Sequence, residues 1–559
     1  MGLRTLLGRV QERLERRAET LSSVVVPARV APGPTAADES LFPLRRAVAL
    51  APEDARASLA LAHGLEQAGR IEDAARSACS AAHLARRRAD AETELEACRT
   101  WARLEPAPPE PAIALAAALA AAGHAAEAAE AYERVIAAHG PRVDLLVALG
   151  AVNDEMGRSD DAFRAYGRAV ELEPENAGAL IYAGVAARDA GRVAEGEAYL
   201  ERALRVVPDS AHAIFNLGLL RMDRGGLDAA ARDFDAARAL RRGEPWTDAV
   251  VGQRLATSRC DPRDMDWGCT RFKLEHDIEQ LGYLRAAGKI GAGYDAVIAE
   301  YRRALGDPSL PADPYSMVPL DPSRYPTLAA SYKRPLHVPA IVLPQGPMIS
   351  ESLHWGDIEA RYLGSEPNMV SIDGLLAPGA LEALRVWCLE ATVWNDVKAG
   401  YLGASMHDGF ANPLLLRIAA ELRERMPRVI GERPLQTMWA FKYDSQYGGT
   451  GVHAHEAAVK LNFWVTPDEA NLDPGGGGLL VHSREAPQDW GFRRFNVEAA
   501  EIRRFLESSG SEAIRVPYRA NRAMLFDSGL FHETDTFRFK PGYENRRVNI
   551  TLLYGTRDR

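Results

Sequence analysis

Three histidines near the end of the chain have an order and a spacing that suit a mononuclear metal site. His453 and His455 are two residues apart, and His532 follows much later. Side chains two residues apart on a β-strand leave the same face, so both imidazoles of the pair can reach one ion. A third ligand would then come from a strand that the fold brings alongside. Three imidazoles suit iron, and they also suit zinc, copper or nickel.

Two predicted strands would position these histidines. Residues 457–465 alternate β-branched and aromatic side chains with smaller or polar ones, which predicts a strand that leaves the His pair. Residues 523–526 predict a second strand, and a turn at 527–529 ends it just before His532. The three histidines are therefore expected on neighbouring β-segments.

Two nearby features have an ordinary explanation beside a functional one. Lys460 and Asn462 lie on the first predicted strand, where they either line a pocket or form a solvated strand face. The glycine run at 475–478 resembles a phosphate-binding loop. It lacks the Lys-Ser/Thr and the helix start that a phosphate cradle needs, so we interpret it as a turn between strands.

The residues around the histidines resemble a known family. Tyr443, the Gly-Thr-Gly at 449–451 and His453 come in quick succession, and a basic strand with Arg-Val-Asn at 547–549 follows His532. This segment is similar to the iron(II)- and 2-oxoglutarate-dependent dioxygenases, and most of all to their prolyl-hydroxylase branch. The resemblance covers roughly residues 367–559, and it implies a double-stranded β-helix, or jelly roll, with Fe(II) and 2-oxoglutarate as cofactor and cosubstrate.

The resemblance also implies roles for individual residues. Arg547 would pair with the far carboxylate of 2-oxoglutarate, for which the two parallel hydrogen bonds of a guanidinium are well suited. Arg546 is the alternative, because adjacent strand residues face opposite ways. The implied metal ligands are His453, His455 and His532, and the implied cosubstrate contacts are Arg547, Tyr443 and Asn549.

His455 departs from the family pattern, which has a carboxylate at this position. In one interpretation His453, His455 and His532 form an all-imidazole triad. In a second, Glu456 supplies the carboxylate, although strand parity directs it to the other face. In a third, His455 is the first ligand and Ala457 leaves a vacant position, as in the iron halogenases, where a halide fills it. Metal identity stays open among these interpretations.

Three functions follow from these interpretations. The first is a hydroxylase that acts on a peptide or protein. The second is a protein-interaction scaffold whose barrel has lost its iron chemistry, and the third is a halogenase-like variant. A decayed site would be expected to lose several family positions, yet Tyr443, His532 and Arg547 are all present. This retention favours a modified oxygenase site.

The second pattern in the chain is a repeat. Glycines recur at intervals of 34 residues at Gly123, Gly157, Gly191 and Gly225. A 34-residue period with helix–turn–helix patterning resembles the tetratricopeptide repeat. An earlier unit around Gly69 is offset by 54 residues, which indicates an insertion of about twenty residues and about five repeats in all. Such arrays present a concave groove, which predicts capture of a peptide or protein, or else a scaffold or dimerisation arm.

The chain is too long for a single core, so several domains are expected. The predicted fold is an α-solenoid of tetratricopeptide repeats followed by an α+β jelly-roll domain. Helices are predicted in the connector at 273–287 and 296–305, and at 378–391 and 413–426 before the barrel. The predicted domains are a basic N-terminal helix and linker at 1–44, the repeat array at 45–243, a helical and proline-rich connector at 244–366, and the jelly roll at 367–559.

Composition narrows the partners and the compartment. The net charge of −10 and the pI near 5.8 give no reason to expect nucleic-acid binding. No apolar run is long enough for a transmembrane segment. The five cysteines are scattered and lack metal-ligand spacing, which fits reduced thiols and predicts a cytoplasmic location. The sequence leaves homo-oligomer formation open.

Overall fold

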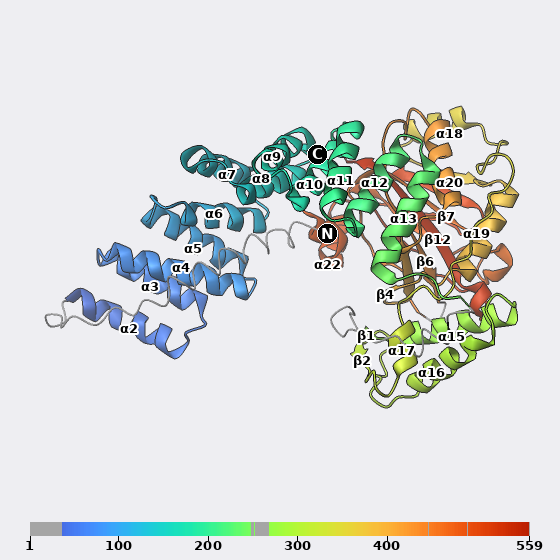
Figure 1. Cartoon of the computed structure of the whole chain (residues 1–559), viewed down its shortest axis with the longest axis horizontal. Coiled ribbons are helices and arrows are strands. Elements are labelled where there is room, and N and C mark those ends of the chain that lie inside the picture. Colours follow the sequence, from blue (N-terminus) through green and yellow to red (C-terminus); the bar gives the residue numbers. More distant parts are fainter. Residues whose placement is uncertain (1–35, 248–250, 252–267, 445–446, 489, 558–559) are drawn as a thin grey trace. The chain divides into compact units, whose positions relative to one another are not determined.

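The computed structural model describes residues 36–247, 251, 268–444, 447–488 and 490–557 (Figure 1). The chain divides into two compact units, Met1–Pro208 and Asp209–Arg559. The basic helix predicted within residues 1–44 lies mostly outside the described residues, which begin in helix α2. No helix in the described part is long and apolar enough to span a membrane.

The first unit consists of helices joined by short turns, and the predicted repeats are seen in it directly. Helices α8 and α10 begin 34 residues apart, as do α9 and α11. The predicted insertion after the first repeat is an additional helix, α5. The helices of this unit are α2 (Ala36–Leu50), α3 (Ala55–Gln67), α4 (Ile71–Arg87), α5 (Ala91–Leu104), α6 (Pro109–Ala121), α7 (Ala125–His139), α8 (Val143–Glu155), α9 (Ser159–Leu172), α10 (Ala177–Asp189) and α11 (Val193–Val206).

The glycines of the repeat have two structural roles, one in the turns and one in the packing between helices. The periodic turn glycines end the first helix of each pair. Their φ angles lie between 70° and 83°, a range that residues with a Cβ rarely adopt. A second set of glycines, which lie within the helices, lets the two helices of a pair approach each other closely. A Cβ on Gly150 of α8 would lie 2.5 Å from the ring of Tyr166 on α9, and one on Gly184 of α10 would lie 2.7 Å from Leu200 on α11. Each glycine therefore makes room for one large side chain.

The described part of the second unit contains two antiparallel sheets besides the two-stranded β1–β2 pair of the connector. The seven-stranded sheet has the order β3-β10-β7-β12-β6-β5-β4, and the three-stranded sheet has the order β11-β8-β9. The predicted strands at 457–465 and 523–526 are confirmed as β7 and β10. The strands are β3 (Met369–Asp373), β4 (Asp396–Lys398), β5 (Tyr401–Ser405), β6 (Leu435–Tyr443), β7 (Ala457–Trp464), β8 (Leu479–Glu485), β9 (Ala513–Val516), β10 (Arg522–Asp527), β11 (Leu530–Thr534) and β12 (Arg547–Thr556).

From β6 onward the chain passes repeatedly between the two sheets. Strand β6 lies in the large sheet, and the segment at His453 then forms a bridge to His532 of β11 in the small sheet. The chain continues through β7 in the large sheet, β8 and β9 in the small one, β10 in the large, β11 in the small and β12 in the large. Eight extended segments therefore share two facing sheets.

The large sheet is buried on both faces. Its outer face carries apolar residues such as Leu461, Ile550 and Leu552, which pack in the main core with the surrounding helices. Its inner face meets the small sheet, for example where Phe526 packs with Val481. The helices that cover the outer face, shown around the sheet in Figure 1, are α12 (Ala211–Asp223), α13 (Leu227–Arg242), α18 (Trp355–Leu363), α19 (Pro378–Glu390) and α20 (Pro413–Arg425).

The helix pair α12–α13 has the repeat pattern but packs in the second unit. Phe215 and Phe234 of this pair lie in the same core as the sheet residues. Arg242 at the end of α13 forms an ion pair with Asp408, and the ring of His407 stacks on Phe215 at a centroid distance of 4.1 Å. The predicted array at 45–243 therefore extends across the division between the two units.

The connector has a core of its own. Its predicted helices at 273–287 and 296–305 are confirmed, and Leu281, Tyr301 and Tyr332 are among the residues that pack together in it. The proline-rich part of the connector includes β2 and α17. The connector elements are β1 (Gly268–Cys269), α15 (Arg271–Ala286), η1 (Ala292–Tyr294), α16 (Asp295–Leu305), β2 (Val318–Pro319) and α17 (Pro326–Ser331).

Outside the connector, the remaining short elements of the second unit are η2 (Met406–Asp408), η3 (Asp468–Ala470), α21 (Phe492–Asn496), α22 (Ala499–Ser508) and η4 (Tyr543–Asn545).

Gly150→Ala should destabilise the first unit by roughly 1–3 kcal/mol, because the added methyl group cannot fit against the Tyr166 ring without a backbone shift. Gly167→Ala on α9 is the matched control, since a Cβ there meets only the Tyr199 hydroxyl at 3.8 Å. This control should stabilise the unit by up to about 1 kcal/mol through helix propensity. Hydrogen exchange in α8 and α9 measures both effects, and equal changes would contradict the packing explanation.

His407 should make the stability of the second unit depend on pH. Burial and the charge of Arg241 lower its pKa to about 4 from an ordinary value near 6.5. The unfolded chain therefore binds the proton more readily, so stability is complete above pH 6.5 and is lost as the pH falls toward 4. The free energy of unfolding, measured in urea, should be lower at pH 4.5 than at pH 7. His407→Phe, which can still stack on Phe215, should reduce this difference by about 1–3 kcal/mol. An unchanged pH dependence would contradict this.

Candidate metal centre

The structure brings the three predicted histidines together. His453 and His532 exchange two backbone hydrogen bonds of 3.0 and 2.9 Å, which join the segment before β7 to β11. The nitrogens of His453, His455 and His532 that could act as ligands all lie within 4.8 Å of one another. The ring centroids are 4.4 to 5.3 Å apart. This is the arrangement that a single bound ion would require.

Backbone carbonyls fix the orientation of two of the rings. His453 Nδ1 lies 2.7 Å from the carbonyl oxygen of Gly451, and His532 Nδ1 lies 2.9 Å from that of Leu530. A carbonyl oxygen can only accept, so each Nδ1 carries the proton and each Nε2 presents its lone pair. Metal-binding histidines are commonly held this way. Burial, together with nearby Lys460, lowers the pKa of His453 to about 4, which keeps this ring neutral at pH 7.

Lys460 points into the middle of the histidine cluster. Its Nζ lies 2.5 Å from His532 Nε2 and 3.2 Å from His455 Nε2. Only 4% of Lys460 and 1% of Asn462 are exposed, so the interpretation of these residues as a solvated strand face is wrong. Burial lowers the pKa of Lys460 to about 7. An ion at the point of convergence requires that this amine either move away or contribute its own lone pair.

Glu456 and Ala457, the residues of the alternative ligand sets, lie outside the cluster. Glu456 is exposed, and the described residues that could hold an ion here are the three histidines. Strand parity predicts this placement of Glu456. Ala457 is buried at the start of β7. His453 lies within the cluster, as the all-imidazole interpretation requires.

Arg547 is a buried cation, and one nitrogen of its guanidinium group has no hydrogen-bond partner. It is 1% exposed and forms no ion pair with any described residue. Its Nε donates to the carbonyl oxygen of Gly477 at 2.7 Å and its Nη2 to that of Gly478 at 3.1 Å, while its Nη1 has no partner. The glycine run is therefore a turn that presents carbonyl oxygens to Arg547, which is the opposite of a phosphate cradle. A Cβ on Gly478 would lie 1.9 Å from the Val516 carbonyl oxygen.

Asn462 and Asn549 lie side by side on the inner face between Arg547 and Lys460. Asn549 donates to Asn462 Oδ1 at 2.8 Å, and Thr551 donates to the same oxygen at 2.9 Å. Both asparagines are almost fully buried, yet Asn462 Nδ2 and Asn549 Oδ1 have no partner. Buried polar atoms are normally hydrogen-bonded, so an unpaired donor and acceptor beside an unpaired guanidinium nitrogen indicate a place built for a polar ligand.

Tyr443 stands across the strand pair from Arg547. The two residues are cross-strand partners on β6 and β12, and the guanidinium carbon of Arg547 lies 4.7 Å from the centroid of the tyrosine ring. The Tyr443 hydroxyl is 2.8 Å from Thr450 Oγ1. Thr450 was not among the predicted site residues, although it is the middle residue of the Gly-Thr-Gly that led to His453.

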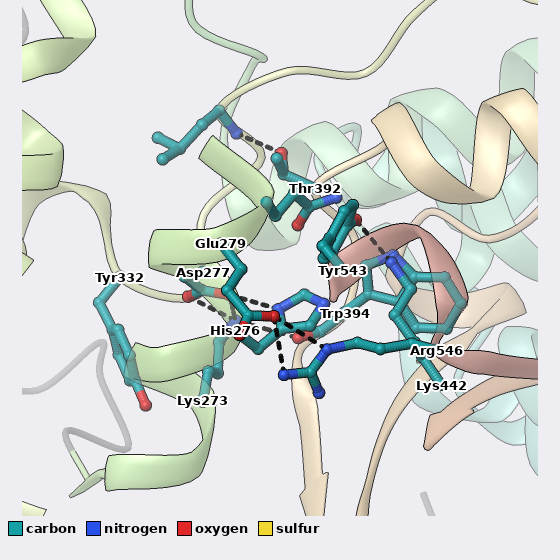
Figure 2. Close-up of polar contacts among 12 residues, drawn as sticks. Lys273, His276, Asp277, Glu279, Tyr332, Thr392, Trp394, Lys442, Tyr543 and Arg546 are labelled. Carbon is teal, nitrogen blue, oxygen red and sulfur yellow. Dashed lines mark hydrogen bonds and ion pairs between the residues drawn. The ribbon is translucent and has the colours of Figure 1, made fainter. Parts of the chain in front are cut away.

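Arg546 faces the opposite side of the sheet and cannot replace Arg547 without a change of register. Its side chain donates to Glu279 at 2.9 Å and 3.1 Å and lies 2.9 Å from Asp444 (Figure 2). Figure 2 shows it within a group of polar side chains between α15 and the outer face of the large sheet. The alternative cosubstrate role of Arg546 therefore does not fit the structure.

This outer group holds the strand ends that carry Tyr443 and Arg547. Lys442 Nζ donates to the Cys388 carbonyl oxygen at 3.0 Å and to the Tyr543 hydroxyl at 2.7 Å, and it lies 4.2 Å from the Trp394 ring centroid. Lys273 of α15 donates to the Trp394 carbonyl oxygen at 3.0 Å. Because Lys442 and Arg546 are neighbours of Tyr443 and Arg547 in the chain, contacts outside the sheet fix the positions of side chains inside it.

The comparisons with known proteins concern the repeats. A family model for the tetratricopeptide repeat matches residues 147–211 and 184–245, so the chain carries these repeats. A MamA fragment from Desulfovibrio magneticus RS-1 is 22% identical over 30% of this chain and 94% of its own, with a TM-score of 0.29. YrrB, a TPR protein with an unusual peptide-binding site, is 19% identical over 35% of this chain and 91% of its own, with a TM-score of 0.25. Among curated proteins, none matches the chain.

Lys460→Met should strengthen metal binding at least tenfold, because it removes an amine from the point where the imidazoles converge. Anaerobic titration with Co(II), followed by its visible absorption, measures this affinity. Lys540→Met, which changes an exposed lysine of the same unit, should have no effect. Weaker binding by Lys460→Met would show instead that the amine is itself a ligand, and His532→Ala should remove the signal altogether.

Proposed function

We propose that the second unit contains an iron(II)- and 2-oxoglutarate-dependent oxygenase domain that hydroxylates a protein or peptide recruited by the repeats. One observation carries the proposal. Three inward imidazoles and a buried guanidinium with an unpaired Nη1 share one enclosed inner face. The imidazoles are suited to a divalent transition metal, and the guanidinium is suited to a carboxylate. Iron and a dicarboxylate cosubstrate need both together.

The path of the chain supports a jelly roll. Eight extended segments pass between two facing antiparallel sheets in the order described above. A double-sheet roll of eight strands has this architecture. In it the His453 segment and β11 are neighbours at one edge, which is why residues far apart in sequence supply one ligand set.

The residues present fit both absent groups. His453, His455 and His532 would hold iron(II) through their Nε2 atoms, and Arg547 would pair with the far carboxylate of 2-oxoglutarate. Asn549 and Tyr443 would contact the same cosubstrate, and Asn462 offers it a further donor. When bound, iron would use dioxygen to insert one oxygen atom into an unactivated C–H bond, while 2-oxoglutarate takes up the other and is converted to succinate and CO2.

The chain's own contribution is electrostatic and steric. Three neutral imidazoles place no negative charge beside the ion, whereas two imidazoles and a carboxylate would place one there. Arg547 adds positive charge on the same inner face, which favours an anionic cosubstrate. The aromatic side chains Tyr443, Trp464 and Phe537 lie within 5.7 Å of the Arg547 guanidinium carbon and exclude water around it.

The position of Lys460 favours a second candidate function. An amine at the point of convergence is what a barrel that no longer binds iron would have, and the chain would then act as an interaction scaffold through its repeats. Tetratricopeptide arrays bind proteins and peptides along their surfaces in either case. The four described cysteines are free, which supports the proposed cytoplasmic location of both candidates.

Arg547→Leu should weaken 2-oxoglutarate binding at least tenfold while leaving metal binding intact, because only the carboxylate partner is removed. Anaerobic loading with Fe(II) and titration with 2-oxoglutarate, followed by the visible charge-transfer band, measures this. The matched control is Arg546→Lys, which keeps a cation in the outer group and should leave the titration unchanged. Equal losses in both variants would contradict the assignment of Arg547.

The same titration separates the candidate functions. A band in the wild type that is lost in His455→Ala supports the all-imidazole oxygenase. A band kept in His455→Ala excludes His455 as a ligand, and a band that responds to chloride supports the halogenase-like variant. Absence of a band in the wild type, with one in His455→Asp or Lys460→Met, supports the scaffold.

A further inference from the structure

A cavity of about 600 Å³ in the second unit lies apart from the histidine cluster. The end of α13, the residues that follow α17 and the β4–β5 hairpin line it, together with Met317 and Asp408. Its volume is in the range of sites that hold a small molecule or a few residues of a peptide. Neither the sequence patterns nor the proposed oxygenase site accounts for it.

The walls of this cavity are predominantly basic. Arg241, Arg242, Lys333 and Arg334 line it, against two carboxylates, Asp396 and Asp408. Arg242 is already paired with Asp408 at 2.8 Å. Among the described residues, the hydrogen-bond partner of Arg334 is the backbone carbonyl oxygen of Arg242, at 3.4 Å. Arg241 is exposed and forms no ion pair with a described residue, so the lining keeps an excess of positive charge.

The cavity reaches the edge of the large sheet at β4 and β5. Ser405 lines it and is the cross-strand partner of Trp439, whose ring centroid lies 5.3 Å from that of His455. Directly opposite residues of an antiparallel pair share a face. Asp396 shares this face as well, because its partner Gly403 is two residues from Ser405. One face of the sheet thus runs from the cavity wall to the histidine cluster.

We propose that this cavity binds an acidic segment of the protein or peptide substrate, next to the residue that reaches the metal centre. The binding itself follows from the cavity, and its link to catalysis rests on the proposed function. Carboxylate side chains spaced along an extended peptide can each pair with a guanidinium in two parallel hydrogen bonds. Asp396 and Asp408 in the lining oppose a continuous phosphate backbone, which disfavours nucleic acid as the occupant.

Fluorescence anisotropy on the full chain tests this with a fluorescein-labelled octapeptide of alternating Glu and Ala. The same peptide with Gln in place of Glu should bind at least tenfold more weakly, and binding of the Glu peptide should fall as salt rises. Arg241→Glu combined with Lys333→Glu should weaken binding at least tenfold. Arg232→Glu together with Arg224→Glu is the matched control, because it makes the same charge change at exposed arginines of the α12–α13 pair outside the cavity.

Several outcomes would overturn the proposal. Equal affinities for the Glu and Gln peptides would exclude charge recognition, and equal losses in the two double variants would move the site away from the cavity. Full displacement of the peptide by a single-stranded oligonucleotide of similar length at lower concentration would identify nucleic acid as the occupant. The peptide assay needs no metal, so an absent iron signal would count against the oxygenase while leaving this result intact.

Discussion

The inner face of the large sheet buries the Lys460 amine and the Arg547 guanidinium, and neither forms an ion pair with a described carboxylate. Burying a charge without a partner is costly, so the surrounding structure has to hold these side chains in place. Imidazole nitrogens accept hydrogen bonds from Lys460, and the carbonyl oxygens of a glycine turn accept hydrogen bonds from Arg547. Arg547 keeps one unpaired nitrogen for a ligand that carries negative charge, whereas Lys460 occupies the point where the imidazoles converge.

The stability that supports this face comes largely from the other side of the sheet. There the same strands present Leu461, Ile550 and Leu552 to a large apolar core, so every second residue contributes to packing while its neighbours remain available for chemistry. The connector adds polar contacts at the strand ends. Lys442 and Arg546 are held from outside, which restricts the freedom of Tyr443 and Arg547 inside.

Much of this arrangement is readable in the sequence, because periodicity is a local property. The 34-residue spacing predicts the helix pairs, and the two-residue spacing of His453 and His455 predicts a shared direction. The burial of Lys460 is not readable in the same way. Parity places it with Asn462 on one strand face, but only the distant strands β8 and β11 determine whether that face meets water or a second sheet. The choice between Arg546 and Arg547 likewise depends on the register of β12 against β6, which is set by non-local pairing.

Helices α12 and α13 continue the repeat in sequence but share the core of the sheet, through Phe215 and Phe234. Removing the repeats at the point where the repeat pattern ends would therefore also remove part of the core of the second unit. A fragment that began at residue 244 would expose the apolar surface of α20 and the sheet, and would be expected to aggregate. The folding unit that contains the sheets is therefore longer than the motif boundary indicates, and it includes one helix pair with the repeat pattern.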